Sequence, residues 1–316
     1  MVQSITDEKV NHIDTSQVKR KLAVIAKEYT SVSSSKGILS VFVHWLCVAI
    51  IYFLLISFNF RWEVSILAFI AISKIQNSLL LLGHEAIHGL LLQNKTLNDF
   101  VSQYFCFAPM GVGCCKARKA HLDHHRYLFT EGDEEIDIQT VKPQTRNAFL
   151  RHIFAPLFGE YAIRFTSRFL PLYKIKSQYK QKFELLPSEA KLDFQSIIIV
   201  NIILLLILIP INWKLYVFFW FLPIITLTAF GHKVKAFCDH ARLKGEPEDS
   251  LNTFKPTLLD RLIFGTQQAY HAEHHLMPTV PYYDLPKLSE TAKLLPNIIY
   301  RKGYFEYLKQ YYQDLN

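Results

Sequence analysis

Cysteine is scarce in this chain of 316 residues. Five cysteines occur, at positions 47, 106, 114, 115 and 238. Their number is odd and their spacing does not match a zinc site, so the sequence excludes both a disulfide framework and a zinc site built on cysteines. We therefore expect reduced thiols that face the cytoplasm or the membrane.

The first 36 residues lack an apolar run of the kind that forms the core of a secretory signal, so we expect no cleavable signal peptide. Acidic residues are also in the minority, with 27 Asp and Glu against 35 Lys and Arg. The basic residues flank apolar segments rather than forming one patch. This distribution favours anionic lipid headgroups over nucleic acid as their partners.

Charge is absent from residues 38 to 60. A helix over this segment would be roughly 35 Å long, which is enough to cross a bilayer. Similar apolar runs cover residues 64 to 82, 194 to 211 and 215 to 230, and half of the whole chain is hydrophobic. The sequence thus predicts an all-α integral membrane protein with four transmembrane helices.

The turns within the two predicted pairs of spans hold only Arg61 and Lys214 as basic residues, and Trp62 and Trp213 lie at the same turns. The positive-inside rule then places both termini and the long central segment in the cytoplasm, in a bacterial inner membrane or an endoplasmic reticulum membrane. We expect a cytosolic N-terminal tail (1 to 36), a membrane domain (37 to 290) and a cytosolic C-terminal tail (291 to 316). Residues 97 to 113 are expected to be interfacial or re-entrant, and residues 148 to 172 to form an amphipathic surface helix.

Eight histidines in three tight clusters are the most informative feature. The clusters are HEAIH (His84, His88), HLDHH (His121, His124, His125) and HAEHH (His271, His274, His275). Residues three and four apart share one face of a helix, so each cluster projects its imidazoles toward one point. Two predicted spans separate the second cluster from the third, which puts all three on the same side of the membrane. Eight ligands exceed the coordination sphere of one ion, so their number predicts two metal ions.

The histidines also allow other interpretations. HEAIH alone fits the zinc-protease pattern with Glu85 as general base, but a membrane zinc protease leaves the two later clusters unexplained. A metal transporter would place ligands inside the spans, which hold only His44. We expect His12, His44, His152 and His232 to have structural or surface roles.

The order of HEAIH, HLDHHRY and HAEHHLMPTVPYYDLPKL, with two spans before the first motif and two between the second and third, resembles the membrane-bound fatty acid desaturase family over roughly residues 38 to 290. The resemblance implies a cytosolic helical cap holding two iron ions, which use O2 and two electrons on unactivated C–H bonds. It implies desaturation of a lipid or acyl substrate, with hydroxylation or ketolation of a lipid, carotenoid or alkane as the alternative. It also implies a separate electron donor, a ferredoxin or a cytochrome with its reductase.

The same resemblance implies a ninth ligand about thirty residues before the last motif. His240, which follows Asp239, occupies that place. The acidic residues near the ligands are interpreted as partners that fix the imidazole tautomers, with a solvated helix face as the alternative. These residues are Glu85, Asp123, Asp239 and Glu273.

Two further hypotheses concern polar residues. Lys74 and Asn77 lie on the same helical stripe as His84 and His88, and a charge at that depth in a span is a candidate for function, so we expect them to line a substrate tunnel. The alternative is that Lys74 snorkels to the membrane surface or pairs with another helix. Basic residues flanking the second cluster are expected to steer an acidic electron carrier, unless they only solvate a loop or meet phospholipid. They are Lys116, Arg118, Lys119 and Arg126.

Overall fold

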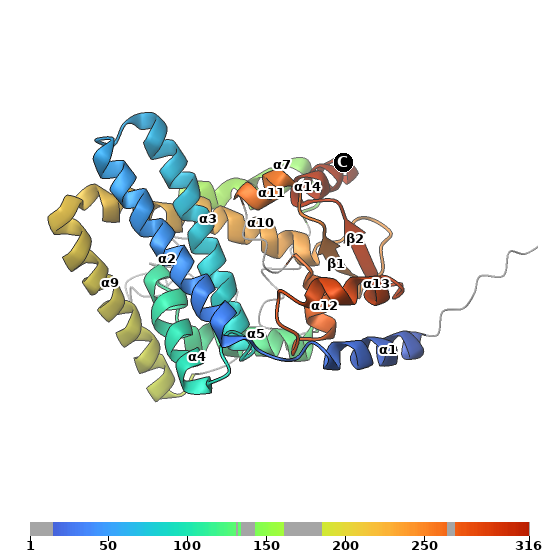
Figure 1. The fold of residues 1–316 in the computed structure, drawn as a ribbon. Coiled ribbons are helices and arrows are strands. Elements are labelled where there is room, and N and C mark those ends of the chain that lie inside the picture. Colours follow the sequence, from blue (N-terminus) through green and yellow to red (C-terminus); the bar gives the residue numbers. More distant parts are fainter. Residues whose placement is uncertain (1–14, 131, 134–142, 161–184, 264–268, 316) are drawn as a thin grey trace, which may run out of the picture.

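The computed structural model describes residues 15 to 130, 132 to 133, 143 to 160, 185 to 263 and 269 to 315 (Figure 1). His12 and residues 161 to 172 of the predicted amphipathic helix lie outside the described residues. Helices dominate the described part, as the sequence predicts. Three of them are long and apolar enough to cross a membrane.

The first two of these helices form a hairpin (Figure 1). They are α2 (Ser34–Ser57) and α3 (Trp62–Ile87). Asn59 and Phe60 adopt positive φ angles in the turn between them, where the chain reverses. α3 extends beyond the predicted end of the second span. The extension carries the first histidine motif on the continuation of a membrane helix.

The third long helix, Pro187–His240, contains both of the other predicted spans. It comprises α9 (Pro187–Tyr216), the short π-helices η4 (Val217–Phe221) and η5 (Ile224–Thr228), and α10 (Ala229–His240). Asn212 has non-helical backbone angles two residues after Pro210, and the Tyr216 hydroxyl donates to Asn201 Oδ1 at 3.2 Å. Fifteen residues of straight helix would separate these two residues by roughly 22 Å. The chain therefore folds back at Asn212 into two arms, while a count of four membrane crossings stays a prediction.

Residues 97 to 113 form short helical pieces packed against α3 and α9. The pieces are α4 (Lys95–Val101), η1 (Ser102–Phe107) and η2 (Ala108–Met110), and α5 (Cys114–Tyr127) follows them. Asp193 of α9 accepts the backbone N–H groups of Cys115 and Lys116 at 2.9 and 3.0 Å. A carboxylate at these orphan N–H groups stabilises the start of a helix. The contact fixes α5, which bears the second histidine motif, to the end of α9.

The all-α prediction missed a small sheet. β1 (Leu251–Phe254) and β2 (Ile298–Arg301) pair in parallel, with Leu251 opposite Ile298. The two strands have only four residues each and are far apart in sequence, so neither shows a usable periodicity. Around them lie α11 (Leu258–Ile263), α12 (His271–Leu276), η6 (Leu285–Leu288), α13 (Ser289–Ala292) and α14 (Tyr304–Asp314).

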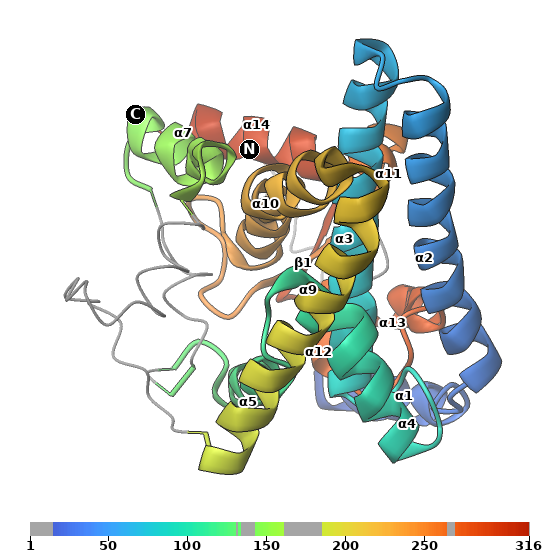
Figure 2. The ribbon, with the colours of Figure 1, turned by 90° about the vertical axis from the view of Figure 1, so that its left-hand side faces the viewer.

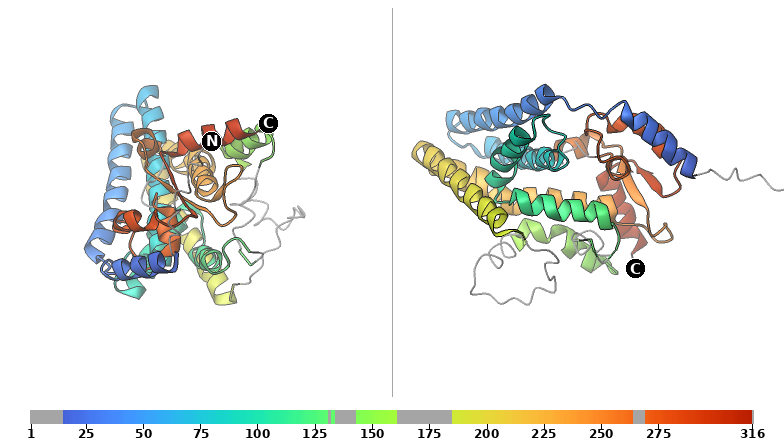
Figure 3. Two further views of the ribbon diagram at one scale, coloured as in Figure 1. Left: turned by 90° about the vertical axis from the view of Figure 1, so that its right-hand side faces the viewer. Right: turned by 90° about the horizontal axis from the view of Figure 1, so that it is seen from below.

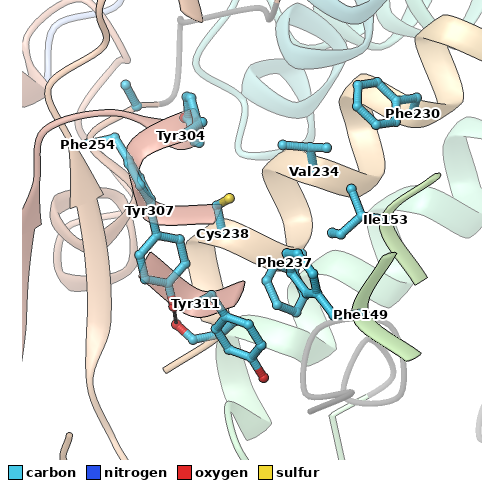
Figure 4. Close-up of a cluster of buried hydrophobic side chains, with 12 residues drawn as sticks. Phe149, Ile153, Phe230, Val234, Phe237, Cys238, Phe254, Tyr304, Tyr307 and Tyr311 are labelled. Carbon is cyan, nitrogen blue, oxygen red and sulfur yellow. Dashed lines mark hydrogen bonds between the residues drawn. The ribbon is translucent and has the colours of Figure 1, made fainter. Parts of the chain in front are cut away.

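The two segments predicted as tails pack into the domain. Tyr304, Tyr307 and Tyr311 of α14 join a buried cluster with α10 and α7 (Arg146–Phe154), which η3 (Ala155–Phe158) follows (Figure 4). At the other end, Leu22 and Ala26 of α1 (Thr15–Lys27) pack against η6 and α13 (Figure 3). Parts of both segments are therefore packed, while the domain boundaries and a cytosolic position of the segments stay predictions. The buried side chains of α1 and α14 form the apolar face of each helix. Their removal from water stabilises the fold, so the two helices belong to it.

Candidate metal centre

Four helices bring the nine predicted ligands together. The end of α3 supplies His84 and, just beyond it, His88, α5 supplies the second motif, α10 ends at His240, and α12 supplies the third motif. These helices converge beside the small sheet (Figure 1). The rings of His84 and His121 lie 4.0 Å apart, and those of His240 and His271 lie 4.5 Å apart. The predicted clusters therefore form one site.

Five of these side chains form a first group whose ligand atoms all lie within 4.8 Å of one another: His84, His88, His121, His125 and His274. His121 Nε2 lies 3.0 Å from the Nε2 atoms of both His88 and His125, and His125 Nε2 lies 3.0 Å from that of His274. In a neutral ring, Nε2 has either one hydrogen or one lone pair, so an atom that faces two neighbours cannot bond well to both. Convergent lone pairs around a shared cation suit this arrangement better, and the group could hold a metal ion.

A second group lies next to the first and contains His124, His240 and His275. His271 adjoins it, with its Nε2 2.8 Å from His240 Nε2. The rings of His125 and His275 stack at 4.3 Å and connect the two groups. The structure thus contains two adjacent sets of imidazoles, which fits the prediction of two ions from the number of ligands.

Asp133 is a site residue that the sequence analysis missed. Its carboxylate is only 1% exposed, and its two oxygens lie 2.9 and 3.0 Å from His124 Nδ1. A hydrogen on Nδ1 that is donated to this carboxylate leaves the Nε2 lone pair free for a metal ion. The only sequence signal was an acidic run after the second motif, which is typical of a solvated loop.

The acidic residues that were predicted to orient imidazoles have different contacts. Asp239 Oδ2 lies 3.6 Å from His271 Nδ1 and pairs with Lys235. Glu85 accepts the backbone N–H of Tyr282 at 3.1 Å.

The other two acidic residues hold no imidazole in the part of the chain that the structure describes. Glu273 accepts hydrogen bonds from the hydroxyls of Thr253, at 2.6 Å, and Tyr300. Asp123 is half-buried and bonded to no imidazole there. Of the four predicted partners, Asp239 therefore comes closest to the expected role.

Burial favours the neutral form of several of these imidazoles. It lowers the pKa of His271, His274 and His275 well below the usual range, and neighbouring histidines add to the effect. Burial, followed by the nearby His121, lowers the pKa of His88 to about 3. A neutral ring is the form that binds a metal ion, so the fold holds these side chains ready for ligation.

The lowered pKa values predict that acid destabilises the metal-free protein. Histidines in the unfolded chain take up protons below about pH 6.5, whereas the buried rings do not. Their contribution to stability is therefore fully present above about pH 6.5 and is lost as the pH falls toward the lowered values, by roughly 1.4 kcal/mol per pH unit and ring. We expect the thermal unfolding midpoint in detergent to drop from about pH 7 to about pH 5, and less steeply in His88→Gln. Equal slopes in the two proteins would contradict this account.

A cavity of about 610 Å³ adjoins the imidazoles. His84, His121, His124, His240 and His271 lie at its wall, together with Leu80 and Leu81 of α3, Ile197, Ile198, Ile202 and Leu205 of α9, and residues of η5 and α10. Most of the other lining residues are also apolar. The two imidazole groups therefore adjoin a space that suits an alkyl chain.

The predicted tunnel residues do not line this cavity. Lys74 and Asn77 are not among the lining residues, because the wall formed by α3 begins at Leu80. The Asn77 amide bonds to Ser73 O of its own helix, and the charge of Lys74 acts on His44 of α2. A role for these two residues in a substrate tunnel stays a prediction. Besides the imidazoles, the polar side chains that do line the cavity are Asn201, Tyr216, Thr228, His232, Lys235 and Asp239.

The basic residues around the second motif have mixed surroundings. Arg118 pairs with Asp99 of α4. The side chains of Lys116 and Lys119 are half-buried, and Arg126 is exposed. Docking of an acidic carrier at these residues stays a prediction.

Comparison with known proteins identifies the class. Residues 60–304 match the family model for fatty acid desaturase, so the chain belongs to the fatty acid desaturase family. It is 26% identical over 249 residues to the dihydrorhizobitoxine desaturase of Bradyrhizobium elkanii, and the match covers 72% of this chain and 67% of the relative. Membership of this family makes the protein an oxidoreductase of the desaturase type. This membership argues against the interpretation of HEAIH as a zinc-protease motif.

Proposed function

We propose that this protein is an O2-dependent di-iron desaturase that introduces a double bond into the acyl chain of a lipid. The observation that carries the proposal is the pair of imidazole groups at the wall of an apolar cavity. The family match and the desaturase relative support the reaction type. The proposal includes the cytosolic position of the metal centre, four membrane crossings and a separate electron donor.

The donor set fits two iron ions. The first ion would be held by His84, His88, His121, His125 and His274, and the second by His124, His240 and His275 with His271 beside them. Neutral imidazole is a good ligand for iron, and neither group contains a thiolate that would favour a zinc or iron–sulfur site. When bound, the irons would supply the two-electron oxidation of C–H bonds with O2.

The protein itself excludes water from the cavity and orients the imidazoles. Apolar side chains from α3, α9 and α10 enclose the cavity, so an alkyl chain can lie in it without contact with water. Asp133 keeps His124 in one tautomer, and Asp239 lies beside His271 Nδ1. Because His84 and His271 are at the cavity wall, a methylene group in the cavity lies next to both imidazole groups.

The proposal is tested by aerobic expression in a host with a simple lipid profile, followed by mass spectrometry of total lipids with localisation of double bonds. We expect acyl chains that lack one pair of hydrogens, no such product without oxygen, and close to two irons per purified chain. A His121→Ala, His125→Ala double variant is the inactive control. Products that gain an oxygen atom instead would favour the hydroxylase alternative, and an unchanged profile with full iron content would contradict both.

A further inference from the structure

The cavity has an opening on the outer surface of α9. Ile198 and Ile202 of α9 and Phe221 of η4 line the cavity, yet they are 43%, 47% and 47% exposed. A side chain that lines the cavity and is also nearly half exposed lies at the rim of the cavity. Since the three residues belong to the two arms that meet at Asn212, the opening lies between these arms. Figure 2 shows α9 in front, with α10 behind it.

The surroundings of this opening are apolar. Only 11% of the most apolar stretch of Pro187–His240 is buried within the protein, and Ile203, Leu206 and Ile207 near the opening are exposed. A helix that shows such a surface over its length is adapted to lipid rather than water. When α9 lies in a bilayer, the opening faces acyl chains.

The depth of the opening follows from the polar end of α9. Asp193 is bonded to the start of α5, so this end of α9 lies close to the helix that carries the second histidine motif. Ile198 and Ile202 follow Asp193 by five and nine residues, which corresponds to roughly 7 and 14 Å along a helix. The opening therefore lies within the half of the bilayer nearer to the metal centre.

We infer that the substrate is an acyl chain still attached to a bilayer lipid, and that it enters the cavity sideways between the two arms. An acyl chain carried by a water-soluble thioester would need an entrance reached from water, whereas the rim side chains identified here are apolar and face lipid. The inference rests on the proposed function and specifies the carrier of its substrate. Ile198, Ile202 and Phe221 then determine access.

A photolabelling experiment tests this route without relying on turnover. The full-length protein is placed in vesicles of phosphatidylcholine in which a fraction of the lipids carries a diazirine on one acyl chain, and the labelled residues are located by mass spectrometry. Leu81 and Thr228 line the cavity and are only 8% and 2% exposed, so they cannot be labelled from the outer surface. We expect label on both residues in the wild-type protein.

Paired variants give the control. Ile202→Trp fills the rim of the cavity, and we expect label on Leu81 and Thr228 to fall about tenfold. Ile203→Trp places the same indole on the next residue, which is 48% exposed and does not line the cavity. In this variant we expect Leu81 and Thr228 to be labelled as in the wild-type protein. Ile198→Trp repeats the test from the other rim position if Ile202→Trp fails to fold.

The outcomes separate this inference from the proposed function. Equal labelling of Leu81 in the two tryptophan variants, or labelling only by a diazirine acyl-CoA added from water, would overturn sideways entry even if desaturated lipids form in the host. Conversely, label that enters the cavity and is blocked by Ile202→Trp supports the route. It does so even if no double bond is ever detected, a result that would count only against the reaction.

Discussion

His240→Ala should lower activity roughly 100-fold or more and reduce the iron content, because it removes a ligand rather than a packing side chain. His240 ends α10, is buried, and has its Nε2 2.8 Å from that of His271. Its ring lies 4.9 Å from that of His124, so it belongs to the second imidazole group. Desaturated products in host lipids and iron per purified chain are the measurements.

His232→Ala is the matched comparison on the same helix. His232 lines the cavity but belongs to neither imidazole group, so this variant should keep its iron. If His232→Ala loses iron and His240→Ala retains it, the ninth ligand has been assigned to the wrong residue.

Asp133→Asn should lower activity by roughly ten- to a hundredfold and weaken iron binding. The substitution keeps the shape of the side chain but removes the charge that favours a hydrogen on His124 Nδ1. Iron affinity is measured by titration of the metal-free protein, and activity by the rate of product formation at saturating iron.

Asp123→Asn serves as the control for a lost carboxylate near the second motif. Asp123 is half-buried and bonded to no imidazole in the described part of the chain, so activity and iron affinity should change little. If Asp123→Asn lost more activity and iron affinity than Asp133→Asn, Asp123 and not Asp133 would be the residue that orients the imidazole.

The grouping of the histidines within each motif was predictable because helix periodicity alone brings them onto one face. The contact of Asp133 with His124 was not predictable. Asp133 lies nine residues beyond His124 in a segment without periodicity, and only the folded chain brings it back to the imidazole of His124. The short strands were missed for a similar reason. Their stability comes from pairing with each other and from burial, neither of which appears in a four-residue segment.

Apolar runs predicted the long helices well, but not which side of α3 the cavity would use. Lys74 and Asn77 share a stripe with His84, yet the Gln76 amide bonds to Trp220 O at 2.9 Å, and Gln76 Oε1 accepts the Thr228 hydroxyl at 2.6 Å. These contacts join α3 to the second arm at this depth. Cavity walls are set by such contacts between helices, and periodicity within a single helix does not contain them.

The hydrogen bonds of Glu273 also bear on the order in which the site assembles during synthesis. Glu273 lies within the third motif, and its carboxylate is held by Thr253 of β1 and Tyr300 of β2. His84 and His88 leave the ribosome long before β2 exists, so until then they have an incomplete set of partners. The third motif is held by both strands only once the C-terminal strand has been made. If the two imidazole groups bind iron as proposed, iron loading is a maturation step of the finished polypeptide.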